Sequence, residues 1–209
     1  LALVGAGEEN LVLVTARGVA KQVTADEVLA TKSGKPVIGL KDGDRVVAAF
    51  RAPAGVDVIA VASDGQVLRM PLDSISVQGR GAGGVAGMKL KAGAEVVGAG
   101  PVIGDGVVLT ITSDSAAKAT PYEEFESKGR GGQGVRVAKL GTAETVTLAW
   151  FGSLGSIGGP GDLLAQMADD EDPKKLDPNP VPFDIEASKR DLVPTKTERQ
   201  VMVLAPSRW

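Results

Sequence analysis

Two glycine-rich segments of the sequence carry the side chains best suited to binding chemistry. They read QGRGAGGV at residues 78–85 and KGRGGQGV at residues 128–135, and each holds an arginine between glycines, Arg80 or Arg130. Glycine lets a backbone adopt positive φ and approach another surface closely, and a loop of this kind with cationic side chains can bind phosphate. The same glycines also suit a purely structural turn that wraps a neighbouring unit, so both interpretations stay open.

Further lysines and arginines recur along the chain at nearly matched places. Three follow the first turn of a repeated unit, others accompany the glycine-rich segments, and two take the place of such a segment near the N-terminus. In that order they are Lys21, Arg69 and Lys118, then Lys89, Lys128, Arg136 and Lys139, then Lys32 and Lys35. Cations that recur once per unit would lie along one rim of a repetitive structure. An ordinary solvated charged face is the alternative.

The sequence offers little for catalysis. It contains no Cys and no His, which removes thiol nucleophiles, imidazole bases and the usual zinc sites. The glycine-rich segments lack the ending of a P-loop, so nucleotide binding is not expected. The acidic run at residues 169–172 lacks the ligand spacing of an EF-hand and is interpreted as a solvated tail or an internal mimic of DNA. We therefore expect no catalytic residue, metal site or cofactor in this stretch.

Composition indicates a folded chain with an uneven distribution of charge. Hydrophobic residues make up 43% of the 209 residues, which is enough for a sizeable core. The net charge of −3 arises in the last 49 residues, which hold 7 basic and 10 acidic residues, whereas the first 160 hold 16 of each. No apolar run could span a membrane and no signal peptide opens the chain, so we expect a cytoplasmic protein. Because the chain starts at Leu1, we expect a piece of a longer polypeptide.

Internal repetition is the feature that must position these residues. Residues 58–90 align with residues 108–140 at an offset of 50 without a gap, and eleven of the 33 positions are identical. Residues 11–40 give a third copy, in which KSGK at residues 32–35 replaces the glycine-rich stretch. Each copy runs from an apolar strand through a small turn into a second short strand. A repeat of this length with several short strands is typical of a propeller-like array of blades.

The copies predict an all-β fold with no helix before residue 160. Strands are expected at the start of each copy and at its end, and a partial strand is expected at residues 1–6. We place three blades at about residues 11–56, 57–106 and 107–160 of a single domain. Residues 161–209 contain two weaker strands and three closely spaced prolines, and they form either a degenerate fourth blade or a tail folded back onto the sheet.

The blade pattern resembles that of a known family. SDGQVLR at residues 63–69, then Pro71, then QGRGAGGVAGMKL at residues 78–90 resemble the C-terminal domains of bacterial type IIA topoisomerase A subunits, those of DNA gyrase and topoisomerase IV. The resemblance covers about residues 11–150. It implies a β-pinwheel of about four blades, each of about four short antiparallel strands, with a basic perimeter that binds and bends double-stranded DNA.

The resemblance also implies partners and a division of labour. The partners would be the remainder of the A subunit, together with the ATPase B subunit. ATP and Mg²⁺ would be used elsewhere in the assembly, and the location would be the nucleoid, with no membrane contact. The cations named above would contact DNA, and the bent duplex would be presented to the catalytic core.

Gyrase members of this family carry a seven-residue box of the form QRRGG(K/R/Q)G. The closest stretch here keeps the Arg-Gly-Gly-x-Gly end, opens with Lys and Gly, and lies in a late copy, which favours the topoisomerase IV-like type or a divergent paralogue. Its residues are Lys128, Gly129, Arg130, Gly131, Gly132, Gln133 and Gly134.

Two other classes of function remain. A propeller-like protein-interaction module without DNA binding fits the neutral charge of the first 160 residues. Scattered cations would favour that module, and cations aligned on one rim would favour DNA. An autonomous enzyme is disfavoured, because no nucleophile and base are available.

Overall fold

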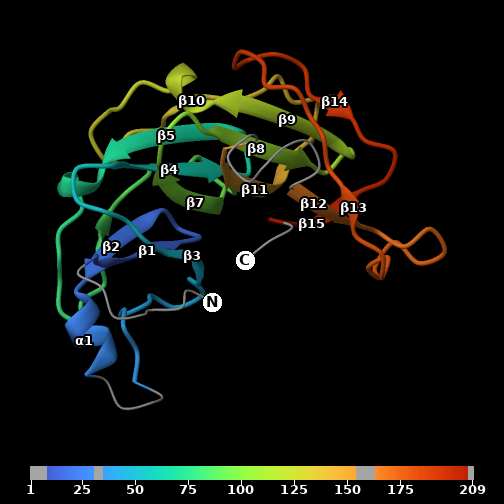
Figure 1. Ribbon diagram of the computed structural model, residues 1–209. Coiled ribbons are helices and arrows are strands. Elements are labelled where there is room, and N and C mark those ends of the chain that lie inside the picture. The colour runs from blue at the N-terminus through green and yellow to red at the C-terminus, as the bar shows by residue number, and fades with distance from the viewer. Residues whose placement is uncertain (1–8, 31–34, 154–162, 207–209) are drawn as a thin grey trace.

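The computed structural model describes residues 9–30, 35–153 and 163–206. The partial strand expected at residues 1–6 and the candidate Lys32 lie outside these residues. The described chain forms four antiparallel sheets of three or four strands, set side by side along an arc (Figure 1). The all-β fold with blade-like sheets is therefore confirmed.

The four sheets follow one another in sequence order. The first sheet has the order β3 (Val46–Arg51), β1 (Leu11–Thr15), β2 (Val19–Val23), β6 (Val85–Ala86). The second has the order β7 (Val96–Val102), β4 (Asp57–Ala62), β5 (Gln66–Pro71), β10 (Val135–Arg136). The third has the order β11 (Val146–Gly152), β8 (Val107–Thr112), β9 (Ala116–Pro121), β14 (Thr195–Lys196). The fourth has the order β15 (Val201–Pro206), β12 (Leu163–Met167), β13 (Val181–Pro182).

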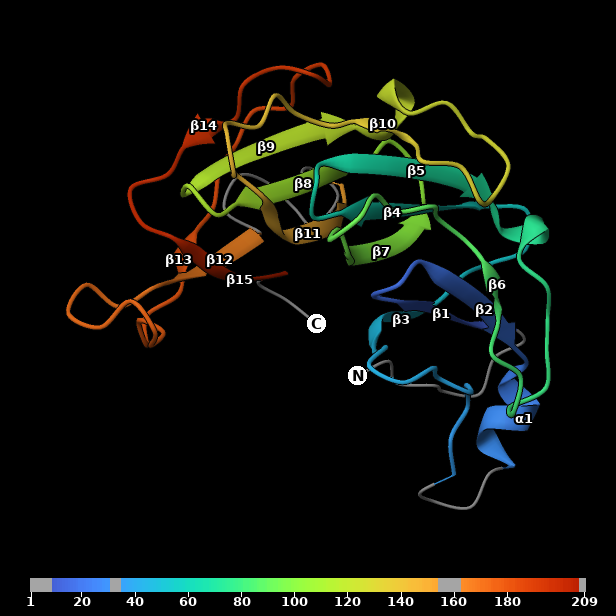
Figure 2. The same ribbon diagram turned by 180° about the vertical axis from the view of Figure 1, so that it is seen from behind.

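The outer strand of each of the first three sheets comes from the following repeat. Val85–Ala86 pairs with β2, although it lies within the second predicted blade, and Val135–Arg136 pairs with β5. The strands β6, β10 and β14 all lie at the outer margin of the arc, as the view from behind also shows (Figure 2). The sheets therefore differ from contiguous blades, because each glycine-rich segment crosses back onto the sheet before it.

The described part of residues 161–209 is divided between two sheets. Its strands β12, β13 and β15 build the fourth sheet, while β14 completes the third. These strands lie in the segment for which the sequence predicts either a degenerate fourth blade or a tail folded back onto the sheet.

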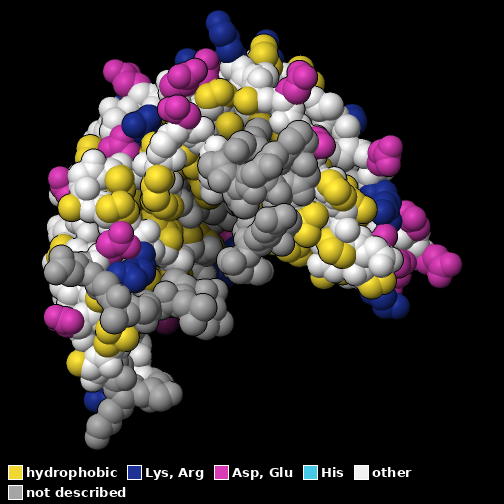
Figure 3. Space-filling model, viewed as in Figure 1, with side chains coloured by type: hydrophobic (Ala, Val, Ile, Leu, Met, Phe, Trp, Pro, Cys, Tyr) yellow, Lys and Arg dark blue, Asp and Glu magenta, His cyan; other side chains and the backbone are white. Residues whose placement is uncertain are grey.

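The core consists of layers between neighbouring sheets. Along β4, Val58 and Ala60 pack into the cluster shared with the first sheet, whereas Ile59 and Val61 pack into the cluster shared with the third. This alternation is the period of two that a strand imposes on its side chains. Because both faces are covered, β1 and β8 are buried along their whole length and β4 along nearly all of it. Figure 3 shows charged side chains of both signs around the outer margin of the arc and apolar side chains nearer its hollow inner side.

One short helix and two 3-10 turns depart from the strand-only expectation. The helix α1 (Ala25–Leu29) follows β2, and the turns occupy Leu72–Ser74 and Tyr122–Glu124 after β5 and β9. The prediction of no helix before residue 160 is wrong at α1. Thr24 accepts a hydrogen bond from the backbone N–H of Glu27, which gives the helix its N-cap. The Thr-x-x-Glu spacing at Thr24 and Glu27 could have predicted this helix start from the sequence. No helix among the described residues is long and apolar enough to cross a membrane.

Candidate nucleic-acid interface

Three loops on the outer margin occupy equivalent places. They are the first rim loop (residues 78–84), the second rim loop (residues 128–134) and the third rim loop (residues 188–194), and each runs straight toward an outer strand. In each, the first backbone N–H donates to a carbonyl oxygen of the preceding sheet at 2.9 Å. The pairs are Gln78 to Gln22, Lys128 to Arg69 and Ser188 to Ala119. The shared hydrogen bond fixes the alignment of the three loops.

The third rim loop is a functional candidate that sequence reasoning missed. Arg190 occupies the place of Arg80 and Arg130, and Asp191 occupies that of Gly131 with a similar positive φ, 60° against 81°. Asp tolerates this conformation better than most residues, which explains how the loop adopts the same backbone path without glycine. The loop lies 60 residues after the second one instead of 50, so it falls outside the aligned repeats. Only the Lys189-Arg190 pair could have signalled it.

Neighbouring repeats meet at these loops. The Gly131 N–H donates to the Gly87 carbonyl at 2.5 Å, and the Lys89 N–H donates to the Gly132 carbonyl at 2.9 Å. The same pattern joins Lys139 to the carbonyl of Leu192 at 3.0 Å. The structure therefore brings Lys89 beside the second rim loop and Lys139 beside the third.

Most of the predicted cations are accessible. Arg80 is half-buried, and the exposed ones are Lys35, Lys89, Lys128, Arg130, Arg136 and Lys139. Lys189 and Arg190 of the third rim loop, which were not predicted, are exposed as well. Lys128 lies 3.6 Å from Glu126, and Arg136 lies 3.1 Å from Asp191. Exposed ion pairs of this kind are weak and are screened by salt, so they do not prevent these cations from meeting a polyanion.

The prediction of DNA contact is wrong for Lys21 and Lys118, because both side chains are buried. Lys21 is 0% exposed, and its ammonium donates to the carbonyl oxygens of Val37, Gly79, Arg80 and Ala82 at 2.7 to 2.9 Å. Lys118 is 2% exposed, and its ammonium donates to Ser188 Oγ at 2.5 Å. Burial lowers the pKa of both lysines, against the opposing effect of a nearby glutamate.

Arg69 is committed to contacts within the fold. Its Nε donates to Asp57 Oδ2 at 2.6 Å on the neighbouring strand, and one Nη donates to the carbonyl of Tyr122 at 3.3 Å. The side chain thus joins the second sheet to the turn that follows β9. We assign it a structural role.

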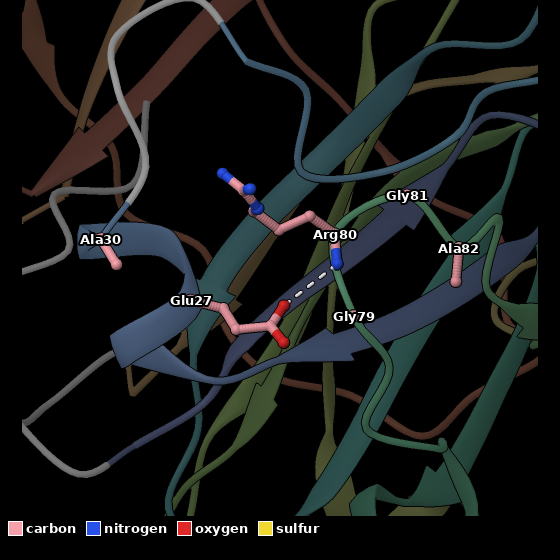
Figure 4. Close-up of a pocket in the computed structure, with 6 residues that line it drawn as sticks. All are labelled: Glu27, Ala30, Gly79, Arg80, Gly81 and Ala82. Atoms are coloured by element: carbon pink, nitrogen blue, oxygen red, sulfur yellow. Dashed lines mark hydrogen bonds between the residues drawn. The ribbon is translucent and has the colours of Figure 1, made fainter.

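The first and third rim loops share a carboxylate contact. The backbone N–H of Arg80 donates to Glu27 Oε2 at 3.0 Å, and that of Arg190 donates to Glu124 Oε2 at 3.3 Å. Figure 4 shows the first contact, with the Arg80 side chain extending from the loop over an open pocket lined by Glu27, Ala30 and residues 79–82.

The second rim loop, which contains the gyrase-type box, is held differently. The repeat offset of 50 places Ser74 where the third unit has Glu124, and Leu68 where it has Lys118. The Arg130 guanidinium donates to the carbonyl oxygens of Ser74 at 2.9 Å and Ala86 at 3.1 Å. Gly134 has a φ of 80°, and a Cβ there would overlap the Val67 carbonyl. The loop can close on the second sheet only because that position carries no side chain.

The described residues contain no group of three or more His, Cys, Asp or Glu side chains that could hold a metal ion.

Comparisons with known proteins agree with this geometry. The family model described as DNA gyrase C-terminal domain, beta-propeller, matches residues 9–53, 57–103 and 107–148, more than half of the chain. The A subunit of DNA gyrase from Leptospira biflexa serovar Patoc (strain Patoc 1 / Ames) is 38% identical over 74 residues, which are 35% of this chain and 9% of that protein.

Solved structures share the fold. A C-terminal domain of DNA topoisomerase IV has a TM-score of 0.78 at 21% identity, over 93% of this chain and 58% of that one. A DNA gyrase A C-terminal domain has a TM-score of 0.73 at 23% identity, over 95% and 62%. The E. coli ParC C-terminal domain has a TM-score of 0.69 at 12% identity, over 96% and 82%. The chain thus spans less than two thirds of the first two structures.

Proposed function

Because the chain belongs to the family of DNA gyrase C-terminal β-propeller domains, we propose that it binds and bends double-stranded DNA for a bacterial type IIA topoisomerase. It would present the bent duplex to the catalytic core. Its partners in the bacterial nucleoid would be the remainder of the A subunit, together with the ATPase B subunit. ATP and Mg²⁺ would be used by those other parts, and no cofactor by this one.

One observation carries the proposal. Three rim loops repeat an arginine at the same place on the outer margin, at Arg80, Arg130 and Arg190, with Lys89 and Lys139 beside the second and third. Cations at regular steps along a convex margin can meet successive phosphates of one duplex. Such contacts release counterions, so affinity depends steeply on salt and little on sequence.

The curvature of the margin supports bending. The four sheets form an arc, so a straight duplex could reach only part of the rim (Figure 1). Bending a short duplex costs on the order of 1 to 6 kcal/mol, which the additional phosphate contacts can offset. Contact with all three rim loops therefore requires a bent duplex.

The proposal is tested with the protein and a duplex of about 40 base pairs, long enough to follow a curved surface, labelled at both ends for energy transfer. We expect a Kd of roughly 1 to 100 µM at physiological salt, tightening at low salt, and a rise in transfer on binding. Absence of binding at low salt would overturn the proposal.

A matched pair of variants locates the contact. Lys139→Ala/Arg190→Ala removes two exposed rim charges, and Lys174→Ala/Lys175→Ala removes two exposed charges from the acidic segment after β12. We expect the rim variant to weaken binding about tenfold or more and to lower the salt slope by about 1.8, which is 0.9 per phosphate. The control variant should bind as the natural chain does.

We assign the chain to the topoisomerase IV-like branch because its box departs from the gyrase form at Lys128 and Gly129. Such a domain would bend DNA without a complete chiral wrap. Ligating a nicked circle in the presence of the protein checks this, because a bend alone leaves the linking number unchanged. A shift in linking number would favour the gyrase branch instead.

A protein-interaction module is the second candidate, favoured by the apolar end of the third rim loop. Leu192 is 48% exposed and Val193 is 74% exposed, where the second rim loop has Gly132 and Gln133. If the duplex is not bound, binding of the chain to the rest of its A subunit, with Leu192→Ser/Val193→Ser as the variant, tests this candidate.

A further inference from the structure

Lys21 is a buried cation whose contacts converge on one rim loop. Three of its four acceptors are the carbonyl oxygens of Gly79, Arg80 and Ala82, at 2.7, 2.9 and 2.9 Å. An ammonium has three protons, so the four acceptors together use its full donor capacity. Removing such a charge from water is costly and is tolerated only when the partners are well placed. The lysine therefore fixes the path of the loop backbone around Arg80.

Glu27 holds the same residue from its other side. Its Oε2 accepts from the Arg80 backbone N–H at 3.0 Å (Figure 4), and its own helix is capped by Thr24. The two peptide groups that flank the Arg80 Cα are thereby fixed, one through its N–H and the other through its carbonyl. The direction in which the Arg80 side chain leaves the loop follows from these two contacts.

The third unit repeats the arrangement. Lys118, like Lys21, is the third residue of its strand, and Glu124 follows it by six residues, as Glu27 follows Lys21. Lys118 donates to Ser188 at the start of the third rim loop, and Glu124 accepts from the Arg190 N–H. A lysine and a glutamate therefore hold the rim loop on two sheets that are not neighbours, and Lys118 meets the side chain of Ser188 where Lys21 meets the loop backbone.

The middle unit has neither residue. Leu68 and Ser74 stand at the two places, and the second rim loop is fixed instead by the Arg130 guanidinium on two carbonyl oxygens. A lysine–glutamate pair thus accompanies the first and third rim loops, and in the middle unit, which lacks the pair, the Arg130 guanidinium holds two carbonyl oxygens.

We propose that Lys21 with Glu27, and Lys118 with Glu124, are positioning pairs that aim Arg80 and Arg190 at phosphates of a bound duplex. The inference rests on the proposed function. It places Lys21 and Lys118 in DNA recognition through another residue, without contact with DNA. Lys21 acts on Arg80, and Lys118 acts on Arg190.

A double-mutant cycle tests the first pair. Lys21→Met, Arg80→Ala and the double variant are compared with the natural chain for duplex affinity at several salt concentrations. We expect each single variant to weaken binding about threefold to tenfold and to lower the salt slope by about 0.9, the value for one phosphate. The double variant should be no weaker than either single variant, because the lysine acts through the arginine.

Leu68→Met is the matched control, since it brings methionine to the equivalent place on the middle sheet. We expect its duplex affinity and salt slope to match those of the natural chain. Lys118→Met with Arg190→Ala supplies a second, independent cycle if Lys21→Met does not fold, as judged by circular dichroism. Additive losses, or weaker binding with an unchanged salt slope, would overturn the inference. If the natural chain binds no duplex, the proposed function fails first.

Discussion

The first and second rim loops occupy the same place on successive sheets but are stabilised by different chemistry. The first is held by a buried ammonium beneath it and a carboxylate beside it, from Lys21 and Glu27. The second lies over Leu68 and depends on Gly131 and Gly134, both with positive φ, and on the Arg130 side chain. A rim can thus repeat in position while the residues that build it change.

The difference shows which features of a repeat are under geometric constraint. Both loops carry a glycine with positive φ next to the outer strand, Gly84 and Gly134, because a Cβ at either place would overlap the strand below. Gly81 has no such requirement, since a Cβ there would meet no atom within 4 Å. Glycine identity between the copies therefore overstates how alike the loops are.

Gly134→Ala should have the largest effect on this comparison. The added Cβ would overlap the Val67 carbonyl oxygen in a backbone conformation that alanine rarely adopts. We expect the free energy of unfolding to fall by about 3 kcal/mol or more. Urea denaturation followed by circular dichroism measures it. Gly81→Ala in the first rim loop should change stability by less than about 0.5 kcal/mol, and equal losses would contradict the asymmetry.

Leu68→Lys would place the buried lysine of the outer units on the middle sheet. Leu68 is 2% exposed, a Cβ at Gly132 of the box would meet its side chain, and Ser74 supplies no carboxylate. We expect a loss of about 2 to 3 kcal/mol from an ammonium without partners. Adding Ser74→Glu should recover about 1 kcal/mol, because an acid then stands six residues after the lysine as in the other units.

The same denaturation assay tests the pair in the middle unit. The comparison is between the single variant Leu68→Lys and the double variant Leu68→Lys/Ser74→Glu. No recovery in the double variant would show that lysine and glutamate do not form a transferable unit.

Much of the fold could be predicted from the sequence, because strand periodicity and repeats are local signals. The strands expected at the start of each copy became β1, β4 and β8, which begin within one residue of residues 11, 58 and 108. The sequence could not predict that the outer strand of a sheet comes from the following repeat, since two-residue strands such as Val85–Ala86 carry no periodicity. Each of these short strands pairs with the preceding sheet because the glycine-rich segment before it crosses back onto that sheet.

The candidate site was predicted less completely, because a sequence does not say which loop covers a strand. Lys21 and Lys118 resembled rim cations, yet each is buried and bonded to the rim loop that crosses back from the following repeat. The six-residue spacing to Glu27 and Glu124 was the available signal that each lysine has a local partner. Arg190 was missed because its loop has neither glycines nor the offset of 50.

The pH dependence of the free energy of unfolding gives the smallest and most specific contrast between the third and the middle unit. Burial lowers the pKa of Lys118 below its usual value of 10.5, despite the nearby Glu124. Between the lowered folded value and about 10.5, the unfolded chain binds the proton more tightly than the folded chain does. The free energy of unfolding therefore gains a contribution that rises with pH through this window. Lys118→Met removes that rise, whereas Leu68→Met on the middle sheet leaves it in place.

The measurement is urea denaturation of these two variants and the natural chain at steps from pH 8 to about pH 11. Burial raises the pKa of Tyr122, which lowers stability above about pH 10, where the unfolded tyrosine ionises. That loss is common to all three proteins, as is the contribution of Lys21, so both cancel in the differences. The stability of the natural chain relative to Lys118→Met should increase with pH, and that relative to Leu68→Met should stay constant. A flat or falling difference for Lys118→Met would mean that its ammonium is hydrated in solution, and the contrast with the middle unit would not hold there.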